Sequence, residues 1–367
     1  MKRFFLAVSI VSAAALIFVS GAGAAPAPGK TRTITDQMGN EVVIPERVER
    51  VVISSVWPLA SVYCLYMGST DKLVGLDPAI ISAAENSALI KVFPDIVKIP
   101  SGFSKNGAIN AEELMKLNPD VVLYSSGAPE DYDVCRQAGI PAVGFSLSIK
   151  DFNTIDTINS WIELLGEVMR QNFDTSEFMK YSKDIEAHVA DRLKDVPASQ
   201  RPRSMILHLY DDSRVGVPAG PSFADYWITA GGGTNVAADS GTGTLSASME
   251  QVYEWDPEII FITNFNPAQP EDLYGNTVGN YDWSGVSAIK NKRVYKMPLG
   301  MYRWYVCNAD SPLTLLWMAK QSQPELFADL DIDGEIKSYY KRFYNLTLSD
   351  EDLSRIYHPS SAAAGGI

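Results

Sequence analysis

The feature that most constrains the fold is a segment that occurs twice, 138 positions apart. Both copies contain an N-cap residue, a Glu two positions later, a Pro, an acidic residue and a pair of β-branched residues; they are Asn110–Tyr124 and Ser248–Ile262. Each copy predicts a short helix, a stop at the Pro and then a buried strand. A repeat this long is not typical of a solenoid. It indicates two similar α/β lobes, and two lobes imply a cleft between them.

The N-terminus has the pattern of an export signal. Lys2 and Arg3 precede an apolar run from Phe4 to Val19, and small residues follow. This predicts a cleavable signal peptide over residues 1–24. The apolar run is shorter than the ~20 residues of a typical membrane span, and an uncleaved anchor is the alternative. Because no Cys lies at the cleavage point, we expect a freely diffusing periplasmic protein and not a lipoprotein.

Charge and cysteine content exclude several classes of protein. The formal net charge is −13, and Lys and Arg are not clustered. This argues against nucleic acid or anionic lipid as a partner, and it is compatible with docking onto a basic receptor surface. The three cysteines are odd in number and widely spaced, at Cys64, Cys135 and Cys307. They indicate neither a disulfide framework nor a cysteine-bound cofactor, and we predict no cofactor.

Strand and helix patterns alternate along most of the chain, which predicts βαβ units and mainly parallel sheets. Residues 152–196 break the alternation with two amphipathic helix patterns. The second pattern runs from Asp174 to Asp195 without Gly or Pro, and as a helix it would be about 33 Å long. It predicts a stiff connection between the lobes, although a long surface helix is the alternative.

The predicted fold class is therefore α/β. We expect two Rossmann-like lobes with central, mainly parallel sheets, joined by one long α-helix, with the ligand cleft between the lobes. The predicted boundaries are 30–151 for the N-terminal lobe, 152–196 for the linking helices and 197–358 for the C-terminal lobe. The Ala-, Gly- and Ser-rich residues 359–367 are predicted to form a disordered tail.

Three stretches carry a resemblance to a known family. They are the hairpin pattern Ile34–Val52, the run Leu-Asn-Pro-Asp-Val-Val at 117–122 and the run Ala-Gly-Gly-Gly-Thr-Asn-Val at 230–236. Their order and spacing resemble those of the helical-backbone (class III) periplasmic solute-binding proteins. The resemblance implies a monomeric protein that feeds an ABC importer. Members of this class carry ferric siderophores, haem or cobalamin, and relatives carry molybdate or tungstate.

The resemblance also implies one acidic docking residue on each lobe, which meets arginines of the permease. Glu250 lies at the start of the second repeat helix, where the family places its second-lobe Glu. Glu112 is its repeat partner, and Glu113 and Glu85 are rival candidates. The alternative for both is that a Glu in the first turn only complements the helix dipole.

Ligands of an open α/β sheet bind beyond the carboxyl ends of the strands, and four such ends carry candidate residues. Ser and Gly residues there can supply hydrogen-bond donors, and aromatic residues can supply apolar contact surfaces. The first lobe offers Ser54, Ser55 and Trp57 after one strand, and Gly102 and Phe103 before the first repeat copy. The second lobe offers His208, Tyr210 and Arg214 after one strand, and Tyr302, Arg303, Trp304 and Tyr305 after the last.

Arg303 is the strongest single candidate. A guanidinium can bind a carboxylate, a hydroxamate or an oxyanion through two parallel hydrogen bonds, and the aromatic residues around it could pack on a macrocycle or a catechol. The alternative is that Tyr302 and Trp304 only cover the sheet edge. The sequence predicts that Arg303→Ala weakens ligand binding strongly without loss of the fold.

Direct metal binding and catalysis are poorly supported. Metal sites of Zn or Mn type need several His and carboxylate ligands, and the only histidines are His188, His208 and His358. A metal is therefore expected already chelated or as an oxyanion. No nucleophile, metalloprotease or nucleotide-binding motif is present. Three scattered cysteines also argue against a nitrogenase-like enzyme component, and a ligand-presenting sensory protein stays open.

The sequence thus predicts a non-enzymatic periplasmic component of an ABC transporter that delivers its ligand to the permease. The first candidate ligand is a metal chelate of the ferric siderophore, haem or cobalamin class. The alternative is a molybdate or tungstate oxyanion. A stiff connecting helix predicts that the lobes close by only a few degrees on binding.

Overall fold

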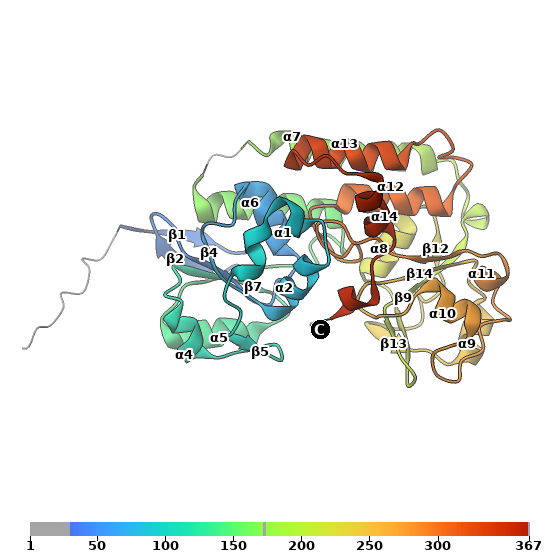
Figure 1. The fold of residues 1–367 in the computed structure, drawn as a ribbon, viewed down its shortest axis with the longest axis horizontal. Coiled ribbons are helices and arrows are strands. Elements are labelled where there is room, and N and C mark those ends of the chain that lie inside the picture. The colour runs from blue at the N-terminus through green and yellow to red at the C-terminus, as the bar shows by residue number, and fades with distance from the viewer. Residues whose placement is uncertain (1–29, 172–173, 366–367) are drawn as a thin grey trace, which may run out of the picture. The chain divides into compact units, whose positions relative to one another are not determined.

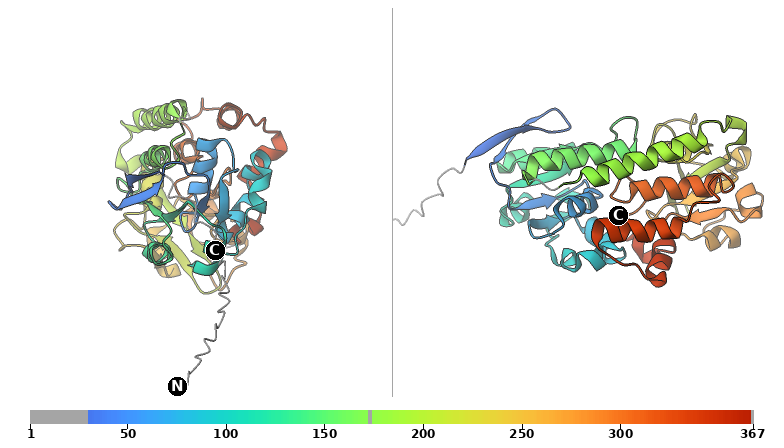
Figure 2. Two further views of the ribbon diagram at one scale, coloured as in Figure 1. Left: turned by 90° about the vertical axis from the view of Figure 1, so that its left-hand side faces the viewer. Right: turned by 90° about the horizontal axis from the view of Figure 1, so that it is seen from above.

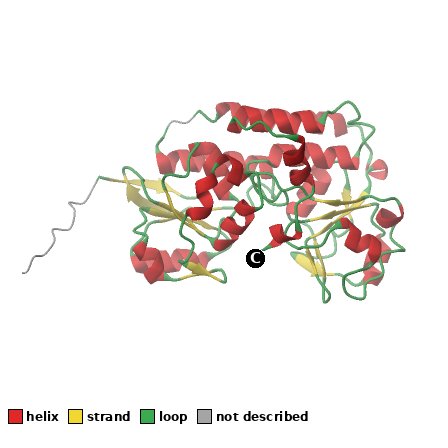
Figure 3. Ribbon diagram, viewed as in Figure 1, coloured by secondary structure: helices red, strands yellow, loops and turns green. Residues whose placement is uncertain are grey.

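The strands divide mainly between two four-stranded parallel sheets, one in each half of the chain (Figures 1 and 3). The structure is a computed structural model that describes residues 30–171 and 174–365. The predicted signal peptide at 1–24 lies outside the described residues. Residues from Thr31 onward form one compact unit. The predicted α/β class with parallel sheets and two lobes is confirmed.

The sheet of the first half has the order β4-β3-β7-β8, and all its pairings are parallel. Its central strands β3 and β7 are buried throughout, as expected for a parallel sheet with both faces covered. The strands are β3 (Val51–Ile53), β4 (Leu73–Leu76), β7 (Val121–Ser125) and β8 (Ala142–Phe145). The helices are α1 (Leu59–Met67), α2 (Pro78–Glu85), α3 (Leu89–Val92), η1 (Pro94–Lys98), α4 (Ala111–Lys116) and α5 (Pro129–Ala138).

Two short antiparallel pairs complete the first half. The pair β1 (Thr31–Thr35) and β2 (Glu41–Pro45) forms the predicted hairpin, with Ile34 opposite Val42. The turn residue Gly39 has φ +80°, a conformation that favours glycine. The second pair is β5 (Ser104–Lys105) and β6 (Ala108–Ile109).

The sheet of the second half has the order β12-β9-β14-β15 and is also parallel throughout. Its strands are β9 (Arg203–Leu207), β12 (Thr234–Asn235), β14 (Ile259–Ile262) and β15 (Val294–Lys296). An antiparallel sheet, β10-β11-β13, consists of Leu209–Tyr210, Val215–Pro218 and Thr244–Ser246. The helices are η2 (Ala198–Gln200), α8 (Phe223–Ala230), α9 (Met249–Trp255), α10 (Pro270–Gly275), α11 (Ser287–Lys290), α12 (Ser311–Ser322), α13 (Ile332–Tyr344) and α14 (Asp350–Tyr357).

The sequence repeat corresponds to the same helix and strand in each half, α4 with β7 and α9 with β14. The repeated N-cap residues Asn110 and Ser248 both accept backbone hydrogen bonds in the first turn of their helices. The repeated acidic residue accepts hydrogen bonds that link its own strand to the start of the neighbouring strand. Asp120 accepts hydrogen bonds from the backbone N–H groups of Glu49 and Arg50.

The second copy makes the same tie. Glu258 accepts from the N–H of Arg203 at the start of β9. In both copies an arginine side chain at that strand start also donates to carbonyl groups at the C-terminal end of the repeat helix, Arg50 to Leu117 and Arg203 to Asp256. The repeat therefore joins a helix to the two central strands of each sheet in the same way in both halves.

Two helices, α6 (Thr154–Met169) and α7 (Ser176–Leu193), lie between the two sheets in sequence. The uninterrupted helix predicted over Asp174 to Asp195 is present as α7, which is shorter by two residues at each end. Its buried residues Phe178, Val189 and Leu193 belong to the large apolar core, and α7 packs on α12 and on α6 (Figure 2). Ion pairs of Glu177 with Arg342 and Arg192 with Asp329 fix it to the second half. The proposed lobe boundaries stay a prediction.

The described residues after α14 include a helical turn, whereas the sequence predicted a disordered tail there. Residues Ser361–Ala364 form a 3-10 helix, η3, and the side chain of Ala363 is 1% exposed. Small side chains let its backbone approach other parts of the chain closely. The prediction of disorder rested on composition. Composition does not show that backbone carbonyls of this segment accept hydrogen bonds from the buried Arg303.

The loop between β15 and α12 is organised around the carboxylate of Asp310. This carboxylate is fully buried and accepts from the N–H of Met301, from Trp304 Nε1 at 3.1 Å and from the hydroxyl of Tyr340 at 3.0 Å. A Cβ at Gly300 would overlap the Asp310 carboxylate, so the loop requires glycine there. Burial raises the pKa of Asp310 to about 6.

We predict that Asp310→Ala lowers the free energy of unfolding by about 3 kcal/mol or more, because each buried donor left without a partner costs roughly 1–3 kcal/mol. Urea unfolding followed by circular dichroism measures the change. Asp329→Ala is the control, since it removes an exposed carboxylate paired with Arg192 and should cost at most about 1 kcal/mol. Equal losses in the two variants would contradict the assigned role of Asp310.

Candidate ligand-binding site

The two predicted serines after β3, Ser54 and Ser55, use their hydroxyl groups in hydrogen bonds inside the first half. Ser54 is buried and its hydroxyl donates to the carbonyl of Leu123 at 3.3 Å. The Ser55 hydroxyl accepts from the N–H of Ser125 at 3.0 Å. Burial raises the pKa of Asp131, and hydrogen bonds from both serines oppose the shift. These serines therefore join β3, β7 and α5, and their donors are already used.

The other first-half candidates occupy three different environments. Trp57 is half-buried against the large core, and its buried Nε1 has no hydrogen-bond partner within residues 30–171 and 174–365. Phe103 is 2% exposed and packs in a small core with Val52 and Val122. Gly102 is exposed, with open space around it. Of these, Trp57 retains a donor that a ligand could use.

Of the candidates after β9, His208 lies in an aromatic group with residues of two other loops. The His208 ring centre lies 4.8 Å from that of Tyr305 and 5.2 Å from that of Phe265. Its Nδ1 lies 3.4 Å from the hydroxyl of Thr263. Burial and, to a smaller extent, the charge of Arg214 lower the pKa of His208 to about 4. The imidazole is therefore neutral at neutral pH.

Arg214 is the cation beside this group. Its Nε is buried and has no hydrogen-bond partner in the described part of the chain. A buried N–H without an acceptor costs free energy. An anion that accepted from Arg214 would therefore remove that cost.

Arg303, which the sequence predicts as a two-pronged clamp for the ligand, is deeply buried. It is 0% exposed, and its Nη2 donates to the carbonyls of Ala363 at 2.9 Å and Gly365 at 3.0 Å. Its guanidinium carbon lies 4.9 Å from the ring centre of Phe265 and 5.7 Å from that of Tyr302. Among the described residues no carboxylate pairs with it. Ring faces and neutral carbonyls thus compensate a full buried charge.

Three further candidates are core residues. Trp304 packs against Trp317 and donates to Asp310. The Tyr210 hydroxyl accepts from Trp283 Nε1 at 2.9 Å. Tyr302 is 2% exposed, next to the Arg303 guanidinium. Their hydrogen bonds explain their burial, so we place Trp304 and Tyr210 outside the site that we propose.

Two residues of the site escaped the sequence prediction. Phe265 lies just beyond β14, at a carboxyl strand end, and contacts His208, Tyr305 and Arg303; the strand-end rule could have found it. Lys296 is buried, and its ammonium donates to the carbonyls of Thr263, Asn266 and Ala268 at 2.8–2.9 Å. Burial lowers the pKa of Lys296 to about 7. Lys296 therefore fixes the loop that presents Phe265.

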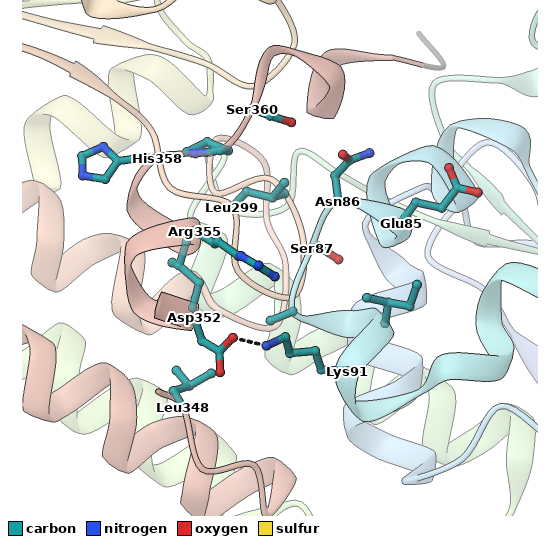
Figure 4. A pocket seen from close by; sticks show the side chains of 14 residues that line it. Glu85, Asn86, Ser87, Lys91, Leu299, Leu348, Asp352, Arg355, His358 and Ser360 are labelled. Atoms are coloured by element: carbon teal, nitrogen blue, oxygen red, sulfur yellow. Dashed lines mark hydrogen bonds and ion pairs between the residues drawn. The ribbon is translucent and has the colours of Figure 1, made fainter. Parts of the chain in front are cut away.

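Two cavities adjoin this region. One, of about 570 Å³, is lined by Tyr210, Phe265, Ser361 and three aspartates, Asp211, Asp212 and Asp272. The other, of about 340 Å³, lies between α2–α3 and α14 and is crossed by the Lys91–Asp352 ion pair (Figure 4). Within the described residues no group of three or more His, Cys, Asp or Glu could hold a metal ion, and no helix is long and apolar enough to cross a membrane.

The two docking candidates are exposed residues of the repeated helices. Glu112 and Glu250 lie in the first turns of α4 and α9, and neither has an ion-pair partner within the described part of the chain. Figure 1 shows both helices on the side of the unit opposite to α7 and α13. The rival Glu113 is paired with Lys116 at 2.6 Å, and the rival Glu85 lines the smaller cavity.

Comparison with known proteins decides the family. The model of a family described as periplasmic binding protein matches residues 59–299. The chain belongs to this family. A periplasmic solute-binding protein from Veillonella parvula is 30% identical, with a TM-score of 0.79, over 92% of this chain and all of that one. The chain is thus a periplasmic substrate-binding protein of the type that serves ABC transporters, and the resemblance to class III members is confirmed.

Of two further relatives, one has a name that states a ligand and the other does not. The molybdate-binding protein MolA of Haemophilus influenzae is 26% identical over 346 residues, which cover 88% of this chain and 94% of that protein. Its molybdate-bound structure aligns with a TM-score of 0.74 at 25% identity, over 87% and 99% of the two chains. An uncharacterised ABC transporter substrate-binding lipoprotein of Bacillus subtilis, YvrC, is 22% identical over 72% of this chain and 77% of that protein.

We predict that His208 makes stability depend on pH. Its folded pKa lies below the ordinary value of 6.5, so between pH 6.5 and about 4 the unfolded chain binds more protons than the native protein does. This contribution is present above pH 6.5 and is lost as the pH falls towards 4. Its size should be on the order of 3 kcal/mol.

Urea unfolding of the wild type and of His208→Gln at pH 4.5, 5.5 and 6.5 isolates this contribution, because all other titrating groups are common to both proteins. The stability difference between them should shrink as the pH falls. A difference that stays constant over this range would show that His208 ionises normally.

Proposed function

We propose that this periplasmic substrate-binding protein captures a compact oxyanion of the molybdate or tungstate type and delivers it to an ABC permease. Binding involves no covalent step, and the protein acts as a monomer. The Arg303 side chain carries the proposal, since its guanidinium is fully buried and lacks a carboxylate partner in the described residues. A buried cation without a counter-ion favours an anionic ligand, because removing such a charge from water is costly.

Other polar groups without a partner in the described residues also support an oxyanion. Arg214, whose charge acts on His208, is a second cation with an unused buried N–H, and Trp57 of the first half has an unused indole N–H. His208, held neutral, adds a ring that can donate one hydrogen bond without further charge. Together these groups offer several donors and two positive charges, which suits an ion with four oxygens.

Similarity to a named relative points to the same class of ligand. The relative whose name states a molybdate function spans most of this chain in both sequence and structure. The overall negative charge of this chain opposes attraction of a distant anion. Recognition must therefore come from the short-range donors around Arg303 and Arg214.

A metal chelate is the second candidate, and two observations favour it. The aromatic group around His208 includes Phe265, Tyr305 and Phe223, which could pack on a macrocycle or a catechol. The adjoining cavity of about 570 Å³ is large enough for a ligand of that size. Its aspartates suit a ligand that is not strongly anionic.

We predict that Arg214→Gln and Arg303→Lys each weaken molybdate binding by about 10- to 100-fold, because each removes a charge-assisted or two-pronged hydrogen bond worth roughly 1.5–3 kcal/mol. Isothermal titration calorimetry with sodium molybdate measures the dissociation constants. Arg192→Lys, on α7 and paired with Asp329, is the control and should bind as the wild type does.

The same titration separates the two candidate ligands. Ferric siderophores, haem and cobalamin are titrated in parallel with molybdate, tungstate and sulfate. Tight binding of a chelate with no heat from either oxyanion would replace the first candidate by the second. Loss of molybdate binding in Arg192→Lys as well would show that the arginine effects are not local.

We further propose that Glu112 and Glu250 dock the protein to its permease. We predict that Glu112→Lys with Glu250→Lys leaves the dissociation constant for the ligand unchanged and lowers uptake at least about 10-fold, since a like charge now faces the permease arginines. Uptake of labelled ligand by cells that express the transporter is the measurement. Glu325→Lys, a change of an exposed Glu outside the repeated helices, should transport normally; undiminished uptake by the double variant would reject the assignment.

A further inference from the structure

The segment Pro359–Gly365, here called the C-terminal strap, covers the guanidinium of Arg303. Arg303 Nε and Nη2 donate to the carbonyl of Ala363, at 3.3 Å and 2.9 Å, and Nη2 also donates to the carbonyl of Gly365 at 3.0 Å. The strap therefore occupies the planar donor edge through which a guanidinium binds an oxyanion. Two peptide oxygens stand where two oxygens of an anion would be expected.

The strap also contacts both halves of the chain. The Ser82 hydroxyl on α2 donates to the carbonyl of Gly365 at 2.8 Å, whereas the Arg303 contacts lie in the second half. At its base, Gln269 Nε2 donates to the carbonyl of Pro359 at 3.3 Å. Ser361 lines the cavity beside Phe265. The strap thus bridges the two halves, where the sequence predicts the ligand cleft.

The contacts that hold the strap are mainly those of its backbone. Ala363 is the one buried residue of η3, so little apolar surface is gained. Hydrogen bonds to a charged donor contribute roughly 1.5–3 kcal/mol each, and ordering the backbone costs roughly 1–2 kcal/mol per residue. These opposing quantities are similar in size, so docking of the strap is reversible.

An anion is a better partner for Arg303 than a neutral carbonyl. Hydrogen bonds in which both donor and acceptor are charged are shorter and stronger than those with one charged partner. Within the described residues, the buried guanidinium of Arg303 has no carboxylate as counter-ion. A ligand anion that reaches Arg303 must displace the carbonyls of Ala363 and Gly365.

We propose that the C-terminal strap is an internal competitor of the ligand: it satisfies Arg303 in the empty protein and leaves when an oxyanion binds. This inference rests on the proposed function. The strap keeps the buried charge paired between rounds of transport. It also lowers the apparent affinity by the factor that its docking equilibrium sets, which favours release of the ligand at the permease.

The test compares two substitutions in the strap of the full chain. Ala363→Gln places a bulky neutral side chain at a buried position and should release the strap. Ala362→Gln makes the same change at an exposed neighbour and is the matched control. We expect Ala363→Gln to bind molybdate about 5- to 50-fold more tightly than the wild type in calorimetry, and Ala362→Gln to match the wild type. Ser82→Ala should lie between them, because it removes one strap contact and none from Arg303.

Hydrogen exchange provides a readout that does not depend on affinity. The amides of the strap should exchange slowly in the empty wild type and faster after saturation with molybdate or in Ala363→Gln. Equal affinity of Ala363→Gln and wild type, or continued protection of the strap with molybdate bound, would overturn the competition while leaving the oxyanion function in place. If neither the wild type nor any variant binds molybdate, the oxyanion function fails, and the competition proposal fails with it.

Discussion

A guanidinium cannot be removed from water unless oxygen acceptors or ring faces compensate its charge, and this requirement organises the centre of the protein. Arg303 meets it with two carbonyls of the C-terminal strap and with the faces of Phe265 and Tyr302. Each compensating group comes from a different part of the chain. The burial of one side chain therefore fixes the positions of the strap, the β14 loop and the β15 loop together.

The two loops that carry these groups are themselves held by buried charges. Asp310 gathers three donors beneath the β15 loop, and Lys296 gathers three carbonyls within the β14 loop. Irregular backbone that is buried needs such partners, because no ladder satisfies its polar groups. Rigid loops keep Phe265 and Tyr305 in place beside His208. An aromatic and cationic site can then persist at strand ends without a ligand.

The sequence predicted the fold well because the fold depends on local signals. The N-caps Asn110 and Ser248 and the buried β-branched pairs act within a few residues, so each repeat copy could be recognised on its own. The site was predicted less well, because burial depends on distant partners. Phe103, for example, packs against Val122 of β7, and no sequence pattern next to Phe103 predicts that contact. The role of Arg303 stays a prediction, and the strap that contacts it lies about 60 residues away in sequence and has the composition of a disordered tail.

The position of the strap links ligand binding to the contacts between the two halves. The halves also meet directly: the N–H of Ala88 donates to the carbonyl of Gly300 at 2.9 Å, and the N–H of Ala309 to the hydroxyl of Ser61 at 3.2 Å. These hydrogen bonds would have to break if the halves opened widely, and the small closing motion of a stiff connection stays a prediction. The strap contacts Ser82 in one half and Arg303 in the other. An anion that displaces the strap therefore removes this link between the halves and can replace it only by contacting both. A ligand that bound Arg303 alone would remove the Ser82 contact without replacing it. Discrimination among anions should therefore depend on whether they also reach a hydrogen-bond donor of the first half. The unused indole N–H of Trp57 is one such donor.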